Sequence, residues 1–234
     1  DDGALVIYTT GSTGYPKPAL LGHRGITCQN MAVTGAFRLD RYKKALLNVP
    51  PSHVACQAAQ LMGCFFNGST AHIMRIFDPK GTLEAIEKYR IESIGQIPAM
   101  FAMEWRLPEF DQYDLSSIEF LCYGGQGASV PMIERMKGMC PQVATGLGLT
   151  EMSGFVTYTT PGASTEEIAD SVGFDAPVTP LSVRLPMKED GLAGDEVSDG
   201  SIGEICFTGP QVFLGYVNDP VATAKTISTD GVLY

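Results

Sequence analysis

The sequence predicts an α/β protein: a mostly parallel β-sheet layered with helices, followed by a small β-rich subdomain. Two observations predict this fold. Short apolar runs alternate with segments of helical periodicity over most of the chain, and from about residue 179 short alternating strands follow, separated by acidic, glycine-rich turns. Strand–helix alternation is typical of parallel strands whose connecting helices cover both faces of a sheet. We therefore expect an α/β region over residues 1–178 and the subdomain over residues 179–234.

The elements are predicted in chain order from these patterns. Three segments carry apolar residues three or four positions apart and are expected to be helical. Thr82 is expected to cap the second helix, and Ser129 the third, with Pro131 in its first turn. The glycine- and threonine-rich segment 159–170 is expected to be a mobile surface loop. The predicted strands are 4–9, 45–49, 70–76, 93–97, 117–123 and 142–147, with 180–187, 203–209 and 212–217 in the subdomain; the predicted helices are 23–39, 81–91 and 129–139.

Composition excludes several classes of partner. The chain has 234 residues, of which 44% are hydrophobic, and a formal net charge of −10. Proteins that bind polyanions usually carry positive charge, so neither nucleic acid nor an anionic membrane surface is expected as a partner. No apolar run reaches the roughly 18 residues that a membrane span needs. No sequence feature sets an oligomeric state.

The cysteines and histidines indicate neither disulfides nor a metal site. The six cysteines form no C-x-x-C pair and lie among apolar neighbours, which is typical of reduced core residues in a cytoplasmic protein. His23, His53 and His72 lack metal-ligand spacing. No signal peptide is visible. The chain does not begin with Met and stops at "STDGVLY" without a polar tail, so we expect both ends to have been cut from a longer polypeptide.

A stretch rich in glycine and hydroxyl residues, "YTTGSTGYPKP" (8–18), follows the first predicted strand. Backbone N–H groups and hydroxyls in such a turn can surround phosphate oxygens, while Lys17 supplies a positive charge. The spacing differs from G-x-x-x-x-G-K-[ST], because Lys17 follows a proline and precedes Pro18. On composition alone, a phosphate loop and a plain glycine-rich turn both remain open.

The order of residues in this stretch resembles the phosphate loop of the adenylate-forming enzymes, whose pattern is close to Y-T-S-G-T-T-G-x-P-K-G. Further motifs similar to those of the family follow in the expected order. The resemblance covers essentially the whole chain, which looks like the central part of the large N-terminal domain of these enzymes. The later motifs are "YGGQGAS" (123–129), "GLGLTEMSG" (146–154), "SVGFDAP" (171–177) and "GEICFTGPQVFLGYVNDPVAT" (203–223).

The resemblance implies an ATP-dependent reaction in two steps. A carboxylate attacks the α-phosphorus of ATP, giving an acyl-adenylate and pyrophosphate, and the acyl group then passes to coenzyme A. Thr150 would contact the α-phosphate, and Glu151 would hold Mg²⁺. Lys17 would neutralise the departing pyrophosphate. The residues expected around the phosphates are Thr9, Thr10, Gly11, Ser12, Thr13, Gly14 and Lys17.

The resemblance also implies an adenine site and an acyl pocket. His53, in "VPPSHVA", would line the acyl pocket, although a helix-capping or merely exposed histidine is an open alternative. The segment "GQIPAMFAM" (95–103) would supply apolar pocket wall from Pro98 to Phe101, and ordinary core stays open for most of it. Leu147 stands where the family has an aromatic residue, and Pro18 where it has glycine, so weaker nucleotide binding is expected. The expected adenine-binding residues are Gly124, Gly125, Gln126, Gly146, Leu147 and Gly148.

Two parts of the family pattern are absent from this sequence: the T-G-D ribose-binding motif and the C-terminal domain with a catalytic lysine. We therefore expect the isolated chain to be weakly active or inactive. Besides an acyl- or aryl-CoA synthetase, two functions remain open: an amino-acid adenylation domain of a peptide synthetase, and a non-catalytic ATP- or AMP-binding module.

Overall fold

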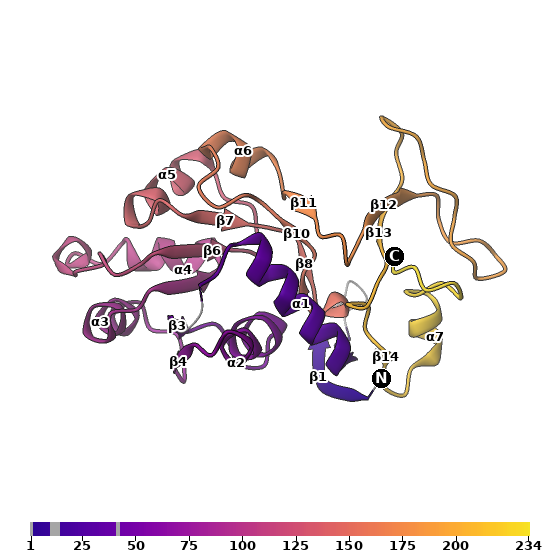
Figure 1. Cartoon of the computed structure of the whole chain (residues 1–234), viewed down its shortest axis with the longest axis horizontal. Helices are drawn as coiled ribbons and strands as arrows, with labels where there is room; N and C mark the ends of the chain where they lie inside the picture. Colours follow the sequence, from indigo (N-terminus) through magenta and orange to yellow (C-terminus); the bar gives the residue numbers. More distant parts are fainter. Residues whose placement is uncertain (1, 10–14, 41–42) are drawn as a thin grey trace.

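A computed structural model describes residues 2–9, 15–40 and 43–234. The predicted α/β fold is confirmed: a five-stranded parallel sheet has the order β4–β3–β5–β6–β7 (Figure 1). Its strands are β3 (Lys44–Leu47), β4 (Thr70–Ile73), β5 (Ser93–Gln96), β6 (Phe120–Tyr123) and β7 (Val143–Thr145). Four of these strands lie inside the predicted runs, and β3 begins one residue before its predicted run.

Both faces of the sheet carry buried apolar side chains, as expected for a parallel sheet that helices cover. Successive side chains of a strand point to opposite faces. Leu46 packs in a core with residues of α3 (Pro79–Tyr89), α4 (Pro98–Glu104) and α5 (Val130–Met139). Leu47 instead packs with Cys56 and Cys64. The opposite face is covered by α1 (His23–Ala36), a π-helix (Ala55–Leu61) and α2 (Met62–Asn67).

Helix ends match the predictions for α5 but not for α3. Ser129 occupies the N-cap position of α5 and a proline its first turn, as predicted, but the Ser129 side chain makes no capping hydrogen bond. The prediction that Thr82 caps α3 was wrong. Asp78 is the cap, since its carboxylate accepts from the N–H of Gly81 at 2.6 Å. Thr82 lies inside the helix and is fully buried.

The segment predicted to be a mobile loop, 159–170, contains the helix α6 (Thr165–Asp170). Ser164 caps it by accepting from the N–H of Glu167 at 3.1 Å. Ile168 is only 1% exposed and joins the core beside α5. A single buried side chain in a polar sequence gives too weak a pattern for a helix to be predicted.

The first strand, β1 (Gly3–Thr9), does not belong to the parallel sheet. It pairs antiparallel with β2 (Lys17–Gly22), and β14 (Gly215–Tyr216) adds to the other side of β2. In Figure 1 this small sheet lies beside α7 (Pro220–Ala224), away from the parallel sheet. An apolar run predicts a strand but not the sheet that the strand joins.

The remaining short elements connect these parts. β12 (Leu181–Arg184) and β13 (Glu204–Phe207) form an antiparallel pair in the predicted subdomain. Because β14 pairs with β2, backbone hydrogen bonds cross the predicted boundary at residue 179, and the two-part division stays a prediction. The others are η2 (Phe110–Gln112), β8 (Gly148–Leu149), η3 (Thr150–Met152), β9 (Gly154–Phe155), β10 (Thr157–Tyr158) and β11 (Phe174–Asp175).

All six cysteines are free thiols, and all but Cys28 are buried. Burial raises the pKa of Cys64 to about 11 and that of Cys122 to about 12, so both thiols stay protonated and act as small apolar groups. In the described part of the chain, every helix is too short or too polar to cross a membrane.

Candidate active site

A cavity of about 780 Å³ lies along the parallel sheet on the face covered by α1 and the π-helix. Its walls are mainly apolar. Small residues widen it: Ala55, Ala59 and Gly63 follow one another at intervals of four, and Gly95 lies on β5. At the amino end of the strands the lining includes Lys43, which forms ion pairs with Glu92 and Glu119. The other wall residues include Val33, Phe37, Ala45, Leu47, Met100 and Cys122.

The carboxyl ends of the strands bring five predicted site residues to this cavity. They come from three separate segments: the loop after β3, the turn after β6, and the β8–η3 segment. The carboxyl edge of a parallel sheet is where ligands usually bind, because the connecting loops meet there. The five residues are His53, Gly124, Gly125, Gly148 and Thr150.

His53 combines both roles that the sequence left open. It lines the cavity, and its Nδ1 accepts from the N–H of Ala55 at 3.1 Å, at the start of the π-helix. Partial burial lowers the pKa of His53, which favours the neutral ring. With Nδ1 acting as the acceptor, the neutral ring carries its proton on Nε2.

Lys17, the predicted phosphate-binding cation, and Glu151, the predicted metal ligand, both contact the side chain of Tyr216. The Nζ atom of Lys17 lies 5.2 Å from the centroid of the Tyr216 ring, within cation–π range. The hydroxyl of Tyr216 donates to Oε1 of Glu151 at 2.6 Å. Burial and this hydrogen bond raise the pKa of Tyr216, so its hydroxyl keeps its proton.

Backbone pairing explains why these distant segments meet. Tyr216 is the register partner of Ala19 on β2, two residues beyond Lys17. The N–H of Phe213 donates to the carbonyl of Glu151 at 2.8 Å. The segment that leads into β14 is therefore fixed to β2 on one side and to η3 on the other. Thr150, the neighbour of Glu151, lines the cavity. The Lys17–Tyr216–Glu151 group therefore lies next to the cavity.

Five residues of the predicted phosphate loop, Thr10, Gly11, Ser12, Thr13 and Gly14, lie outside the described residues. The loop's flanks are described. Thr9 is buried and pairs in register with Lys17 across the hairpin. The carbonyl of Pro18 accepts from the N–H of Val217 at 2.8 Å, so this position links β2 to the end of β14 although proline lacks an N–H.

Other predicted residues do not line the cavity. Phe101 is fully buried in the core against α5, and Met100 of the same helix lines the cavity in its place. Pro98 is buried at the start of α4. Gln126 is exposed. Leu147 packs against the core of the β1–β2–β14 sheet.

Gly146 is required by close packing. A Cβ atom there would lie 1.9 Å from the carbonyl oxygen of Thr157. The side chain of Thr157 accepts from the N–H of Leu147 at 2.9 Å, which holds the "GLGL" segment against β10. Gly125 has φ +77°, in the region that favours glycine.

The described residues contain no group of three or more His, Cys, Asp or Glu that could hold a metal ion by themselves. Glu151 is a single carboxylate beside Lys17 and Tyr216. The Glu151 carboxylate alone fits Mg²⁺, which keeps several waters and is usually held by one or two carboxylates together with the phosphates of a nucleotide.

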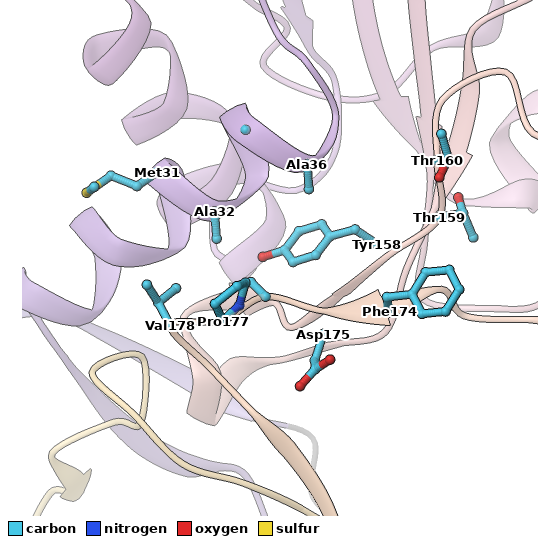
Figure 2. A pocket seen from close by; sticks show the side chains of 12 residues that line it. Met31, Ala32, Ala36, Tyr158, Thr159, Thr160, Phe174, Asp175, Pro177 and Val178 are labelled. Carbon is cyan, nitrogen blue, oxygen red and sulfur yellow. The ribbon is translucent and has the colours of Figure 1, made fainter.

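A second, shallower pocket of about 470 Å³ lies between α1 and the β10–β11 segment. Figure 2 shows Met31 and Ala32 of α1 on one side, and Pro177 and Val178 on another. The hydroxyl of Tyr158 donates to the carbonyl of Phe155 at 2.9 Å. None of the predicted site residues lines this pocket.

Sequence reasoning missed two polar residues. Tyr216 lies in the 203–223 motif, where its only signal is a tyrosine that follows a glycine on a short predicted strand. Glu104, which is fully buried on α4, follows an apolar segment that carries no signal for a buried carboxyl.

The fold and the ordered motifs are those of an adenylate-forming enzyme. The AMP-binding enzyme family matches residues 1–217, and the chain belongs to this family.

Its relatives are named as CoA ligases. The chain is 32% identical over 229 residues to a feruloyl-CoA synthase of Amycolatopsis sp, covering 97% of this chain and 45% of that protein. It is 27% identical over 241 residues to 4-coumarate-CoA ligase 2 of Narcissus pseudonarcissus, covering 100% and 42%. The chain thus spans less than half the length of these two curated relatives.

Solved structures show the same fold. The N-terminal domain of FACL13 from Mycobacterium tuberculosis has a TM-score of 0.85 at 24% identity, over 100% of this chain and 56% of that chain. Apo MatB from Rhodopseudomonas palustris has a TM-score of 0.82 at 21% identity, over 100% and 44%.

Proposed function

We propose that this chain forms the nucleotide- and acid-binding part of an AMP-forming acyl- or aryl-CoA ligase. One observation supports the proposal most directly: Lys17 and Glu151 share a contact with Tyr216, and Thr150 places the same segment on the wall of the cavity. A positive charge, a carboxylate and an acyl-sized cavity therefore lie side by side, as adenylation requires.

The reaction brings two anions together, a carboxylate and the ATP triphosphate. Lys17 binds the β- and γ-phosphates and stabilises the charge that builds up as pyrophosphate leaves. Glu151 holds Mg²⁺, which supplies charge neutralisation on the phosphates when it is bound. Thr150 donates its hydroxyl to the α-phosphate. Tyr216 keeps the Glu151 carboxylate oriented toward Lys17.

The acid binds in the apolar cavity with its carboxylate at the carboxyl edge of the sheet. The neutral His53 ring donates from Nε2 to a carboxylate oxygen. Gly124 and Gly125 allow close approach because they carry no side chain. The thiol of coenzyme A then attacks the acyl carbonyl, AMP leaves, and the thioester forms.

The cavity supports an extended, mainly apolar acid. It spans β5 from Ser93 to Gln96, about 10 Å at the usual rise per strand residue. The small residues Ala55, Ala59, Gly63 and Gly95 give it width as well as length, which suits a ring as well as a chain. The names of two relatives, feruloyl-CoA synthase and 4-coumarate-CoA ligase, point to the same kind of acid.

A non-catalytic nucleotide-binding module is the second candidate. Leu147 favours it, because this side chain packs into the core and supplies no aromatic face to adenine.

Pyrophosphate exchange separates these functions. The natural polypeptide that contains this chain is assayed with ATP, Mg²⁺ and a panel of aryl, fatty and amino acids. Exchange that depends on an aryl or fatty acid, and that falls at least a hundredfold in Lys17→Ala and Glu151→Gln, is expected. ATP binding without exchange for any acid would favour the non-catalytic module, and exchange with amino acids alone would favour a peptide synthetase.

A further inference from the structure

One side chain joins the two walls of the cavity. Gln60 lies on the π-helix, and its Nε2 donates to the carbonyl of Gly95, on β5, at 2.8 Å. Both residues line the cavity. The Gln60 side chain therefore crosses the cavity from the helical wall to the sheet wall and stands in the space that an acid would use.

Gly95 makes room for this contact. A Cβ atom there would lie 2.7 Å from Nε2 of Gln60, closer than two such atoms can approach. The amide thus occupies the place that a side chain at position 95 would take. Side chains of a strand alternate between the faces of a sheet, so Ser93, two residues earlier, points to the same face. Gln60 is the group that fills this face of β5 at Gly95.

The helical wall behind Gln60 is held in place. Nδ2 of Asn30, on α1, donates to the carbonyl of Ala58 at 2.9 Å and to that of Ile26 at 2.8 Å. Asn30 is only 1% exposed, so this link between α1 and the π-helix is shielded from water. The backbone next to Gln60 is therefore fixed, and the amide leaves Gly95 by rotation of its own side chain.

Gln60 divides the cavity along the strands. On the carboxyl side of Gly95 lie His53 and Thr150, at the predicted reactive end. On the amino side lies a second section, which is lined by Ser93. The step from Gly95 to Ser93 lengthens the cavity by about 7 Å at the usual rise per strand residue. An acid whose carboxylate lies at His53 meets the Gln60 amide before its tail can enter this second section.

Moving the amide away from Gly95 is unfavourable. Oε1 of Gln60 is buried and has no hydrogen-bond partner among the described residues. If Nε2 also left the Gly95 carbonyl, neither end of the amide would be paired, and buried polar groups without partners destabilise the state that contains them. A hydrocarbon tail supplies no hydrogen bond in exchange. Longer acids therefore bind less favourably than acids that end at Gly95.

We propose that Gln60 is a specificity-determining residue of the acyl site: its amide ends the acid-binding section at Gly95 and limits the enzyme to short acyl chains or acids with a single ring. This inference rests on the proposed function and narrows it, because an acid can use the full length of β5 only when the amide moves aside. A glutamine that merely braced the π-helix against the sheet would affect all acids alike.

The first test measures binding and needs no turnover. Straight-chain acids from butyrate to dodecanoate are titrated by calorimetry into the natural polypeptide, with AMP present so that no adenylate forms. The dissociation constant of dodecanoate should fall at least tenfold in Gln60→Ala, while that of butyrate stays within threefold of wild type. Gln57→Ala, the same substitution on the same helix at a residue that does not line the cavity, is the control and should leave both values unchanged.

The second test restores the limit from the opposite wall. Gly95→Val is combined with Gln60→Ala, which places a side chain where the amide stood. The double variant should return the dissociation constant of dodecanoate to within threefold of wild type, a reversal that a loss of stability cannot produce. If Gln60→Ala does not fold, Gln60→Ser takes its place with the same criteria.

Pyrophosphate exchange with the same acids separates this inference from the proposed function. The ratio of kcat/KM for dodecanoate to kcat/KM for butyrate should rise at least tenfold in Gln60→Ala, with KM for ATP within twofold. Exchange by wild type with unchanged ratios and affinities in Gln60→Ala, or with an equal loss for every acid, would overturn the role of Gln60 alone. The expected shift in affinity without exchange by wild type would contradict the proposed function and support the role of Gln60. Absence of acid binding by both proteins would overturn that role.

Discussion

Replacing Glu104 with glutamine should change how folding stability depends on pH. The carboxyl is fully buried, and burial raises its pKa from 4.5 to about 8. Below pH 4.5 it is protonated in both the folded and the unfolded chain. Between pH 4.5 and 8 the unfolded chain loses this proton and the folded chain keeps it, so rising pH stabilises the unfolded state. Above pH 8 the Glu104 carboxyl is ionised in both the folded and the unfolded chain, so it no longer changes the free energy of unfolding with pH.

The size of the effect follows from the shift. Each pH unit in this range lowers the free energy of unfolding by about 1.4 kcal/mol, and the whole range amounts to about 5 kcal/mol. Glu104→Gln has nearly the same shape and no proton to lose. Its stability relative to wild type should therefore rise by this amount between pH 4.5 and 8 and stay constant above.

The assay is urea unfolding of wild type and variant at half-unit steps from pH 5 to 9, with the two free energies subtracted at each pH. Subtraction cancels the titration of groups that both proteins share. Glu134→Gln, on an exposed position of α5, controls for the loss of one negative charge. A flat difference between pH 5 and 8 for Glu104→Gln would refute the reasoning, because it would mean that the folded chain ionises Glu104 readily.

Three further substitutions test other parts of the site. Tyr216→Phe removes the hydrogen bond to Glu151 and should lower the free energy of unfolding by about 1–2 kcal/mol, measured by urea unfolding; an unchanged midpoint would contradict the contact. Leu147→Tyr should tighten ATP binding about fivefold in titration calorimetry, the value of one aromatic stacking contact of about 1 kcal/mol, and equal affinities would count against an adenine site there. Gly146→Ala forces a methyl group onto the carbonyl of Thr157 and should cost roughly 3 kcal/mol of stability, so a wild-type melting temperature would show that this packing is wrong.

The parallel sheet could be predicted because its strands leave a strong local pattern. Each lies in a short run with apolar residues, and in β3 the neighbours Leu46 and Leu47 pack into cores on opposite faces of the sheet. The separate β1–β2–β14 sheet could not be predicted in this way. Its strand β2 begins with Lys17 and Pro18, which interrupt the apolar pattern, and its third strand comes from the other end of the chain. Pairing between distant segments depends on tertiary packing that local patterns do not encode.

Parts of the candidate site were predicted to different degrees. The ordered motifs selected His53, Gly124 and Thr150, and all three line the cavity. Phe101 was selected for its apolar character, yet on a helix the preceding residue, Met100, faces a different direction and reaches the cavity instead. A sequence segment predicts that a helix supplies a wall, but the face of that helix is set by packing.

Tyr216 shows how the small sheet serves the chemistry. Lys17 and Glu151 come from segments with no direct backbone pairing to each other, and each is linked to the segment around β14. The Tyr216 side chain contacts both groups, Lys17 with its ring and Glu151 with its hydroxyl. A direct pair would neutralise both groups before a nucleotide arrived, whereas separated charges remain available to phosphate oxygens and to a metal ion. We therefore expect the antiparallel sheet to set the spacing of the two charged groups in the proposed phosphate site.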